Sequence, residues 1–135
     1  MKSSELTRYD PASGRVVNKL TVPGEEVQQY LDLDPYLVEG EADFLTDYVL
    51  NKVITRRPAS TVFAEVTTVA ANGTDTITVS GIPTGAEITL VGTGFRQSAI
   101  GDGTLLKLSF AIAGQYELEV KNFPDLSFKA TIHAT

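Results

Sequence analysis

The sequence predicts an all-β protein with one short helix, and three observations support this fold class. Apolar and polar residues alternate with a period of two over much of residues 81–135, as they do in strands that bury one face. Glycine-containing turns separate these runs at even spacing. Helical spacing of apolar residues is confined to residues 25–33. We therefore expect a small antiparallel sandwich or open barrel in the last part of the chain.

The first 58 residues predict two hairpins with a short helix between them. In the first hairpin, Asp10-Pro11 and Gly14 favour a tight turn, since Gly14 can adopt a positive φ. In the second, Asn51 tolerates a positive φ. Strands are expected at residues 6–9, 15–22, 37–38, 47–50 and 53–55, and a helix at residues 25–33.

The sequence Arg56-Arg57-Pro58-Ala59-Ser60 predicts a short linker. Pro58 lacks an amide donor and biases Arg57 toward an extended conformation. We therefore expect two parts, a hairpin-rich attachment region at residues 1–58 and a sandwich at residues 59–135. The sandwich strands are expected at residues 61–69, 76–80, 88–91, 95–100, 104–110, 115–121 and 127–134.

Composition excludes several classes of protein. The formal net charge is −6 and the isoelectric point is about 4.7, so the chain should repel nucleic-acid backbones. It contains no cysteine, which rules out disulfides and thiolate metal sites. No apolar run approaches the roughly 18 residues of a membrane-spanning helix, so no membrane insertion is expected. The first ten residues lack the apolar core of a signal peptide, and we expect the chain to be made and kept in a cytoplasm or released by lysis.

No residue pattern indicates an enzyme or a cofactor. His133 is the single histidine, and we expect it to be solvated on the last strand. Glu39, Glu41 and Asp43 lack the spacing of a calcium loop and are expected to form an acidic surface loop. The segments 92–94 and 101–103 are glycine turns and not phosphate loops, because no helix with a following Lys-Ser/Thr is expected after either.

One segment is a candidate ligand-facing loop. Phe95, Arg96 and Gln97 lie between two glycine turns, and an aromatic ring, a guanidinium and an amide could together hold a sugar or a carbonyl edge. The alternative is that Phe95 packs inward while Arg96 is solvated.

Two sets of motifs resemble known proteins. The turn at residues 81–85, the strand entry Gly114-Gln115-Tyr116 and the turn Asn122-Phe123-Pro124 are similar to small immunoglobulin-like or prealbumin-like sandwiches of virion and surface proteins. The segment Tyr9-Asp10-Pro11-Ala12-Ser13-Gly14-Arg15-Val16 resembles the YDPxTG-type opening of small tail-associated and tail-fibre-assembly proteins of tailed bacteriophages, with Ser13 in place of threonine. Residues 39–58 are similar to the hairpin that precedes the sandwich in such proteins, although Leu50-Asn51-Lys52 lacks the more typical glycine.

The resemblance implies a structural or accessory component of a phage virion, at the tail or tail fibre, with other virion proteins as partners. Two alternatives remain open, a module that binds a host-surface glycan or protein, and a fibre-assembly chaperone that leaves the mature particle. Because phage tails have cyclic symmetry, we expect a homo-oligomer or several symmetry-related copies. Large apolar residues in the short segments of residues 1–58 form the candidate docking surface: Leu20, Val22, Tyr30, Leu31, Tyr36 and Tyr48.

Overall fold

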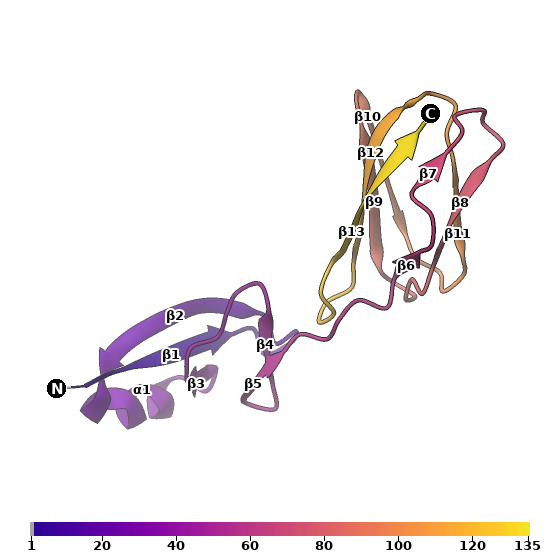
Figure 1. The fold of residues 1–135 in the computed structure, drawn as a ribbon. Coiled ribbons are helices and arrows are strands. Elements are labelled where there is room, and N and C mark those ends of the chain that lie inside the picture. The colour runs from indigo at the N-terminus through magenta and orange to yellow at the C-terminus, as the bar shows by residue number, and fades with distance from the viewer. Residues whose placement is uncertain (1) are drawn as a thin grey trace. The chain divides into compact units, whose positions relative to one another are not determined.

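The computed structural model describes residues 2–135 and confirms an all-β fold (Figure 1). Strands contain 49% of the chain, whereas helical residues contribute 7%. The chain divides into two compact units, residues 1–58 and residues 59–135, called here the N-terminal and C-terminal units. Among the described residues, no helix combines the length and hydropathy needed to span a membrane.

The N-terminal unit contains a three-stranded antiparallel sheet in the order β2-β1-β3, a short helix and a separate hairpin. Residues 24–26 form a 3₁₀ turn that leads into the helix. Together the turn and the helix cover residues 24–33, close to the helix expected at residues 25–33. The elements are β1 (Ser3–Tyr9), β2 (Val16–Pro23), η1 (Gly24–Glu26), α1 (Val27–Leu33), β3 (Leu37–Glu39), β4 (Asp47–Leu50) and β5 (Val53–Arg56).

A small apolar core holds this sheet to the helix. Its buried members are Leu6, Val22, Val27 and Leu37, while Leu20 and Leu31 pack against it from partly buried positions. Thr7 is also buried, and its hydroxyl donates to the carbonyl oxygen of Gly40 and accepts the amide of Ala42. The polar group is thus fully bonded, and it ties β1 to the segment after β3.

Both predicted turns of this unit form. The Asp10 carboxylate accepts the Ala12 amide and the Ser13 hydroxyl, and Gly14 adopts a φ of 80°. In the second hairpin, Asn51 and Lys52 adopt φ values of 50° and 62°. Two consecutive positive φ values are typical of the tight turns that match strand twist.

The C-terminal unit contains two sheets that lie face to face (Figure 1). One has five strands in the order β10-β9-β12-β13-β7, and the other has three in the order β11-β8-β6. All pairs are antiparallel except β13 with β7. The strands are β6 (Phe63–Ala64), β7 (Thr68–Val69), β8 (Thr76–Ser80), β9 (Glu87–Gly92), β10 (Phe95–Ile100), β11 (Leu106–Ser109), β12 (Gly114–Lys121) and β13 (Phe128–Ala134).

The core of this unit follows the alternation seen in the sequence. Leu118, Val120 and Ile132 are almost completely buried between the sheets, together with Ile77 and Val79 from β8. The intervening residues Glu117, Lys121 and Lys129 are exposed, as the period of two predicts.

One strand prediction is wrong. Residues 61–69 do not form a single strand, because β6 pairs with β8 in one sheet and β7 pairs with β13 in the other. The segment crosses between the sheets at residues 65–67, and a crossing chain cannot keep one continuous ladder of hydrogen bonds. The blurred alternation at Val62, Phe63 and Ala64 is the sequence counterpart of this crossing.

Candidate functional site

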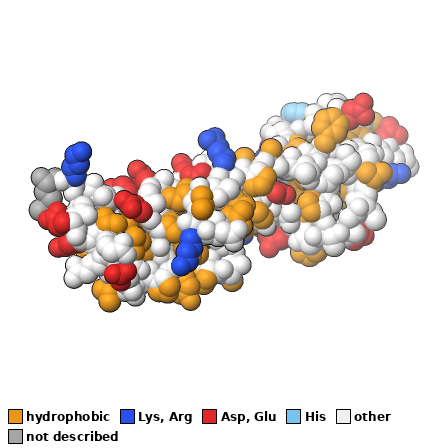
Figure 2. All heavy atoms as spheres, turned by 90° about the horizontal axis from the view of Figure 1, so that it is seen from below, with side chains coloured by type: hydrophobic (Ala, Val, Ile, Leu, Met, Phe, Trp, Pro, Cys, Tyr) orange, Lys and Arg blue, Asp and Glu red, His pale blue; other side chains and the backbone are white. Residues whose placement is uncertain are grey.

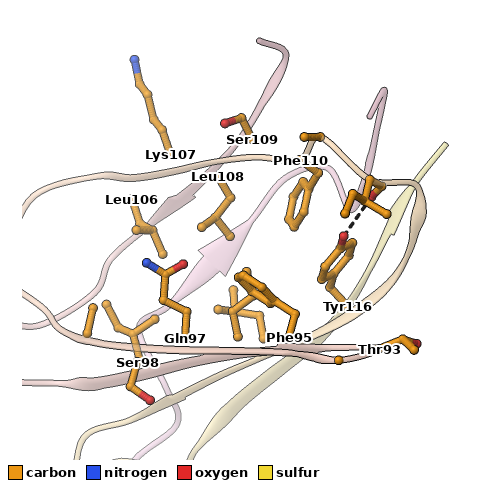
Figure 3. Close-up of a pocket in the computed structure, with 17 residues that line it drawn as sticks. Thr93, Phe95, Gln97, Ser98, Leu106, Lys107, Leu108, Ser109, Phe110 and Tyr116 are labelled. Carbon is orange, nitrogen blue, oxygen red and sulfur yellow. Dashed lines mark hydrogen bonds between the residues drawn. The ribbon is translucent and has the colours of Figure 1, made fainter. Parts of the chain in front are cut away.

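The C-terminal unit has an apolar groove between β10 and β11, with a volume of about 570 Å³ (Figure 3). This volume lies within the range of roughly 300–1,000 Å³ that is usual for ligand sites. Side chains from β10 form one wall, and side chains from β11 and its continuation form the other. The principal lining residues are Phe95, Gln97, Leu106, Leu108, Phe110 and Tyr116.

Phe95, Arg96 and Gln97 begin strand β10, which has the bounds expected at residues 95–100, so the expectation that these three residues form a ligand-facing loop is wrong. Because side chains alternate along a strand, Phe95 and Gln97 point into the groove, as Figure 3 shows, whereas Arg96 is not among its lining residues. The three side chains therefore cannot surround one ligand. Phe95 remains 42% exposed, so it is a wall of the groove and not a core residue.

Three aromatic rings close one end of the groove. The Tyr116 ring lies 4.5 Å from that of Phe110 and 6.1 Å from that of Phe95, between ring centroids. Its hydroxyl donates to the carbonyl oxygen of Ile112 at 2.8 Å (Figure 3). Gly92 is required beside it, because a Cβ there would collide with the Tyr116 ring. The ring contacts and the hydrogen bond therefore hold this apolar surface in place.

The second wall of the groove, formed by β11 and its continuation, was not predicted from the sequence. Leu106, Leu108 and Phe110 alternate as core residues would, and Leu106 and Leu108 are indeed partly buried. Their role in a groove depends on β11 lying at the edge of its sheet, opposite β10 at the edge of the other. Strand order of this kind leaves no local signal in the sequence.

The strands beside the groove carry cations without acidic partners. Arg96 and Lys107 form no ion pair within residues 2–135, whereas Lys121 and Lys129 both pair with Glu119. Hydrogen bonding to Lys121 is the main cause that holds the pKa of Glu119 below its usual value. Neither β10 nor β11 contains an acidic residue. The two edge strands that border the groove therefore carry only positively charged residues, whereas Asp102 lies in the turn between them and the whole chain carries a net charge of −6.

The six residues of the candidate docking surface do not share one surface. Val22 and Tyr48 are buried, with exposed fractions of 4% and 9%, because the short segments of the N-terminal unit use them as interior. Leu20 and Leu31 are partly buried against its core. Tyr30 and Tyr36 remain exposed, as do Phe44 and Leu45 of the same unit. Figure 2 shows apolar side chains exposed on one face of this unit.

The remaining candidates have simple environments. His133 is exposed on β13, as expected. Glu41 pairs with Lys19 at 3.5 Å, and Asp43 accepts the amides of Leu45 and Thr46. These amide bonds, with that of Leu45 the largest contribution, hold the pKa of the Asp43 carboxyl below its usual value. Within the part of the chain that is described, no three His, Asp or Glu side chains come together as a metal site would require.

Comparison with known proteins identifies no relative from which a role could be transferred. No protein-family model matches this sequence, and neither curated proteins nor solved structures give a match.

Proposed function

We propose that the chain is a structural accessory component of a tailed-phage particle, located at the tail or its fibres and attached through its N-terminal unit. The observation that carries the attachment role is that α1 has large apolar side chains both toward the core and toward solvent. Val27 and Leu31 face the core of the unit, while Tyr30 and Leu33 are 38% and 81% exposed. Two of the five exposed residues of this seven-residue helix are thus large and apolar, beside Gln28, Gln29 and Asp32, and these two gain free energy when a partner covers them.

Other parts of the same unit support attachment. Phe44 and Leu45 are 51% and 76% exposed, and Leu50 and Val53 are exposed in the β4–β5 hairpin. The buried apolar cluster between its sheet and helix has four members, and Val38, Ala42, Tyr48 and Val49 are buried outside that cluster. A unit with a small core and many exposed apolar side chains is stabilised by burial against a neighbour.

The choice of a phage particle rests on the resemblance of residues 9–16 to phage tail-associated proteins. In this structure the segment is a well-bonded turn: the Arg15 carbonyl accepts the Asp10 amide, and the Val49 amide donates to the Gly14 carbonyl. The motif therefore joins the first hairpin to β4, and this structural role accounts for its Asp, Ser and Gly residues. The partners we propose are other tail proteins, with several copies of the chain arranged on the symmetry of the tail.

Mass spectrometry of purified particles of a phage that encodes the chain tests this proposal. We expect the chain to be present, in a fixed ratio to the tail proteins. Its absence from mature particles, combined with loss of fibres when it is deleted, would instead identify the assembly chaperone.

A pair of surface variants tests the attachment surface. Leu33→Ser should reduce incorporation into particles without changing solubility or melting, because Leu33 is 81% exposed. The matched control is Leu105→Ser, which removes a leucine that is 59% exposed on the C-terminal unit and should leave incorporation unchanged. Equal incorporation of both variants would argue against attachment through α1.

A host-surface binding module is the second candidate, and the groove on the C-terminal unit favours it. Aromatic rings beside an amide can stack on a sugar and bond to its hydroxyls. In this reading Gln97→Ala reduces adsorption to host cells while the chain is still incorporated into particles. Unchanged adsorption would contradict the binding of a host-surface glycan in the groove.

A further inference from the structure

The two sheets of the C-terminal unit differ in width, and the groove lies where they fail to match. Five strands face three, and both β10 and β11 are edge strands. All six residues of β10 are exposed, including the groove-lining residues Phe95, Gln97 and Ala99. A fourth strand beside β11 would lie over these side chains. The open space beside β11 therefore lies where one additional strand of the three-stranded sheet would lie.

The backbone of β11 offers the hydrogen bonds that such a strand needs. Residues 106–109 pair with β8 on one side, and no described residue bonds to the main chain on the other side. An unpaired edge of this kind is a template for an incoming extended segment. In the groove, Leu106 and Leu108 point inward, while Lys107 and Ser109 point away from it (Figure 3).

Charge indicates the chemistry of the occupant. Lys107 has no ion-pair partner within residues 2–135, and neither does Arg96 on the opposite edge. Side chains directly opposite each other on paired strands attract when their charges differ and repel when their charges agree. Pairing of these edges between two copies of the chain would bring Arg96 and Lys107 close to like charges. A different segment with an acidic side chain opposite Lys107 is favoured by both the geometry and the charge.

We propose that the groove binds an extended segment of a partner protein, which adds to β11 as a fourth strand. Apolar side chains at every second position of the segment enter the groove between Leu108 and Phe95, and an Asp or Glu between them lies beside Lys107. Main-chain bonds to β11 supply affinity, and the apolar and acidic positions supply specificity. This proposal goes beyond the attachment of the N-terminal unit and does not depend on it.

Selection from a random library of displayed twelve-residue peptides tests the proposal on the full chain. The Ala99→Trp variant serves for counter-selection, because an indole on this exposed position of β10 fills the groove. Gln97→Trp is the second blocking variant if the first fails to fold by circular dichroism. We expect enriched peptides to alternate apolar residues with polar ones that include Asp or Glu. Failure to enrich peptides against the counter-selection, or enrichment of peptides without this pattern, would overturn the proposal.

The most enriched peptide, labelled for fluorescence anisotropy, then tests the pairing with Lys107. Lys107→Glu should weaken binding about threefold to tenfold, and exchanging the acidic residue of the peptide for Lys should restore it. The matched control is Lys129→Glu, which reverses a charge that is 72% exposed on β13 and should leave binding unchanged. Equal effects of the two variants would contradict the assigned edge.

Hydrogen exchange and oligomeric state distinguish a partner segment added to β11 from binding elsewhere and from a second copy of the chain in the groove. Bound peptide should slow amide exchange within residues 106–109, since those amides that face solvent become paired. Slowing confined to other segments would contradict strand addition at β11. A concentration-dependent dimer that Ala99→Trp abolishes would show that a second copy of this chain fills the groove, which would overturn the proposal of a separate partner.

Discussion

Gly14 lies at a position where a side chain has no room. Its φ is 80°, and a Cβ there would collide with the carbonyl group of Val49. The Val49 amide donates to the Gly14 carbonyl at 2.8 Å, so the main chains of the turn and β4 lie side by side. The turn at residues 10–14 therefore also joins the two hairpins of the N-terminal unit.

Gly14→Ala should lower the free energy of unfolding of the N-terminal unit by about 2–3 kcal/mol, through the positive φ and the collision together. Gly73→Ala is the matched control, because Gly73 has a φ of 76° and nothing within 4 Å of the added Cβ. It should cost about 1 kcal/mol in the C-terminal unit. Urea unfolding measures the stability of both variants. Tyrosine fluorescence follows Gly14→Ala, because four of the five tyrosines precede residue 59. Circular dichroism follows Gly73→Ala. Equal losses of unfolding free energy in the two variants would show that the collision with Val49 contributes nothing.

Asp34 connects three parts of the N-terminal unit through its carboxylate. It accepts the Tyr36 amide at 2.9 Å and the Arg8 guanidinium at 2.8 and 2.9 Å. The Tyr36 amide is the largest cause that holds the pKa of the Asp34 carboxyl below 3.8, with Arg8 adding to it. Because the folded-state pKa is lowered, the stabilisation is complete above pH 3.8 and is lost as the pH falls through the folded-state value.

Asp34→Asn should therefore be less stable than the natural chain at pH 7, and the difference should shrink as the pH falls through the lowered folded-state pKa of Asp34. Arg8→Gln should lose only part of the stabilisation, because the Tyr36 amide still donates. Urea midpoints from tyrosine fluorescence between pH 2 and 7 measure both variants. A difference between Asp34→Asn and the natural chain that is constant with pH would contradict the ionic origin.

At the scale of elements, the β4–β5 hairpin is complete but its turn is not optimal. Lys52 adopts a φ of 62°, a conformation that disfavours residues with a side chain. Its sequence Asn51-Lys52 occupies the place where tight hairpins prefer Asn-Gly. The departure from glycine that the sequence shows is therefore a real local strain.

Lys52→Gly should raise the free energy of unfolding of the N-terminal unit by about 0.5–1 kcal/mol, since relief of the positive φ exceeds the added freedom of the unfolded chain. Lys52→Ala is the control, because it removes the same charge and leaves the conformational cost. Urea unfolding followed by tyrosine fluorescence compares the two. Equal stability of the two variants would show that the turn is not strained.

Elements whose signal is local were predicted from the sequence. The alternation at Leu118 and Val120 specifies the buried face of β12, and Asp10 and Gly14 specify their turn. Elements that depend on distant partners were not. Residues 61–69 divide between two sheets, and the groove arises because β10 and β11 are consecutive in the chain but lie at the edges of different sheets. Apolar residues such as Val22 and Tyr48 look equally suited to a core or to a docking surface, and only packing decides between them.

At the scale of the whole molecule, the two units have separate cores and different free surfaces. The N-terminal unit exposes apolar residues on α1 and around β4–β5, and the C-terminal unit has an apolar groove beside unpaired cations. This division suits a chain that holds one partner through each unit. It also means that residues 59–135 should fold without residues 1–58.

The most direct test of attachment through the N-terminal unit follows the two units separately into phage particles. Residues 1–58 and residues 59–135 are each fused to a fluorescent protein, expressed during infection and counted in purified particles. If the N-terminal unit is the attachment device, the fusion of residues 1–58 is incorporated at levels close to the full chain and the fusion of residues 59–135 is absent. Incorporation of residues 59–135 alone, or of neither fusion while the full chain is present, would contradict attachment through the N-terminal unit.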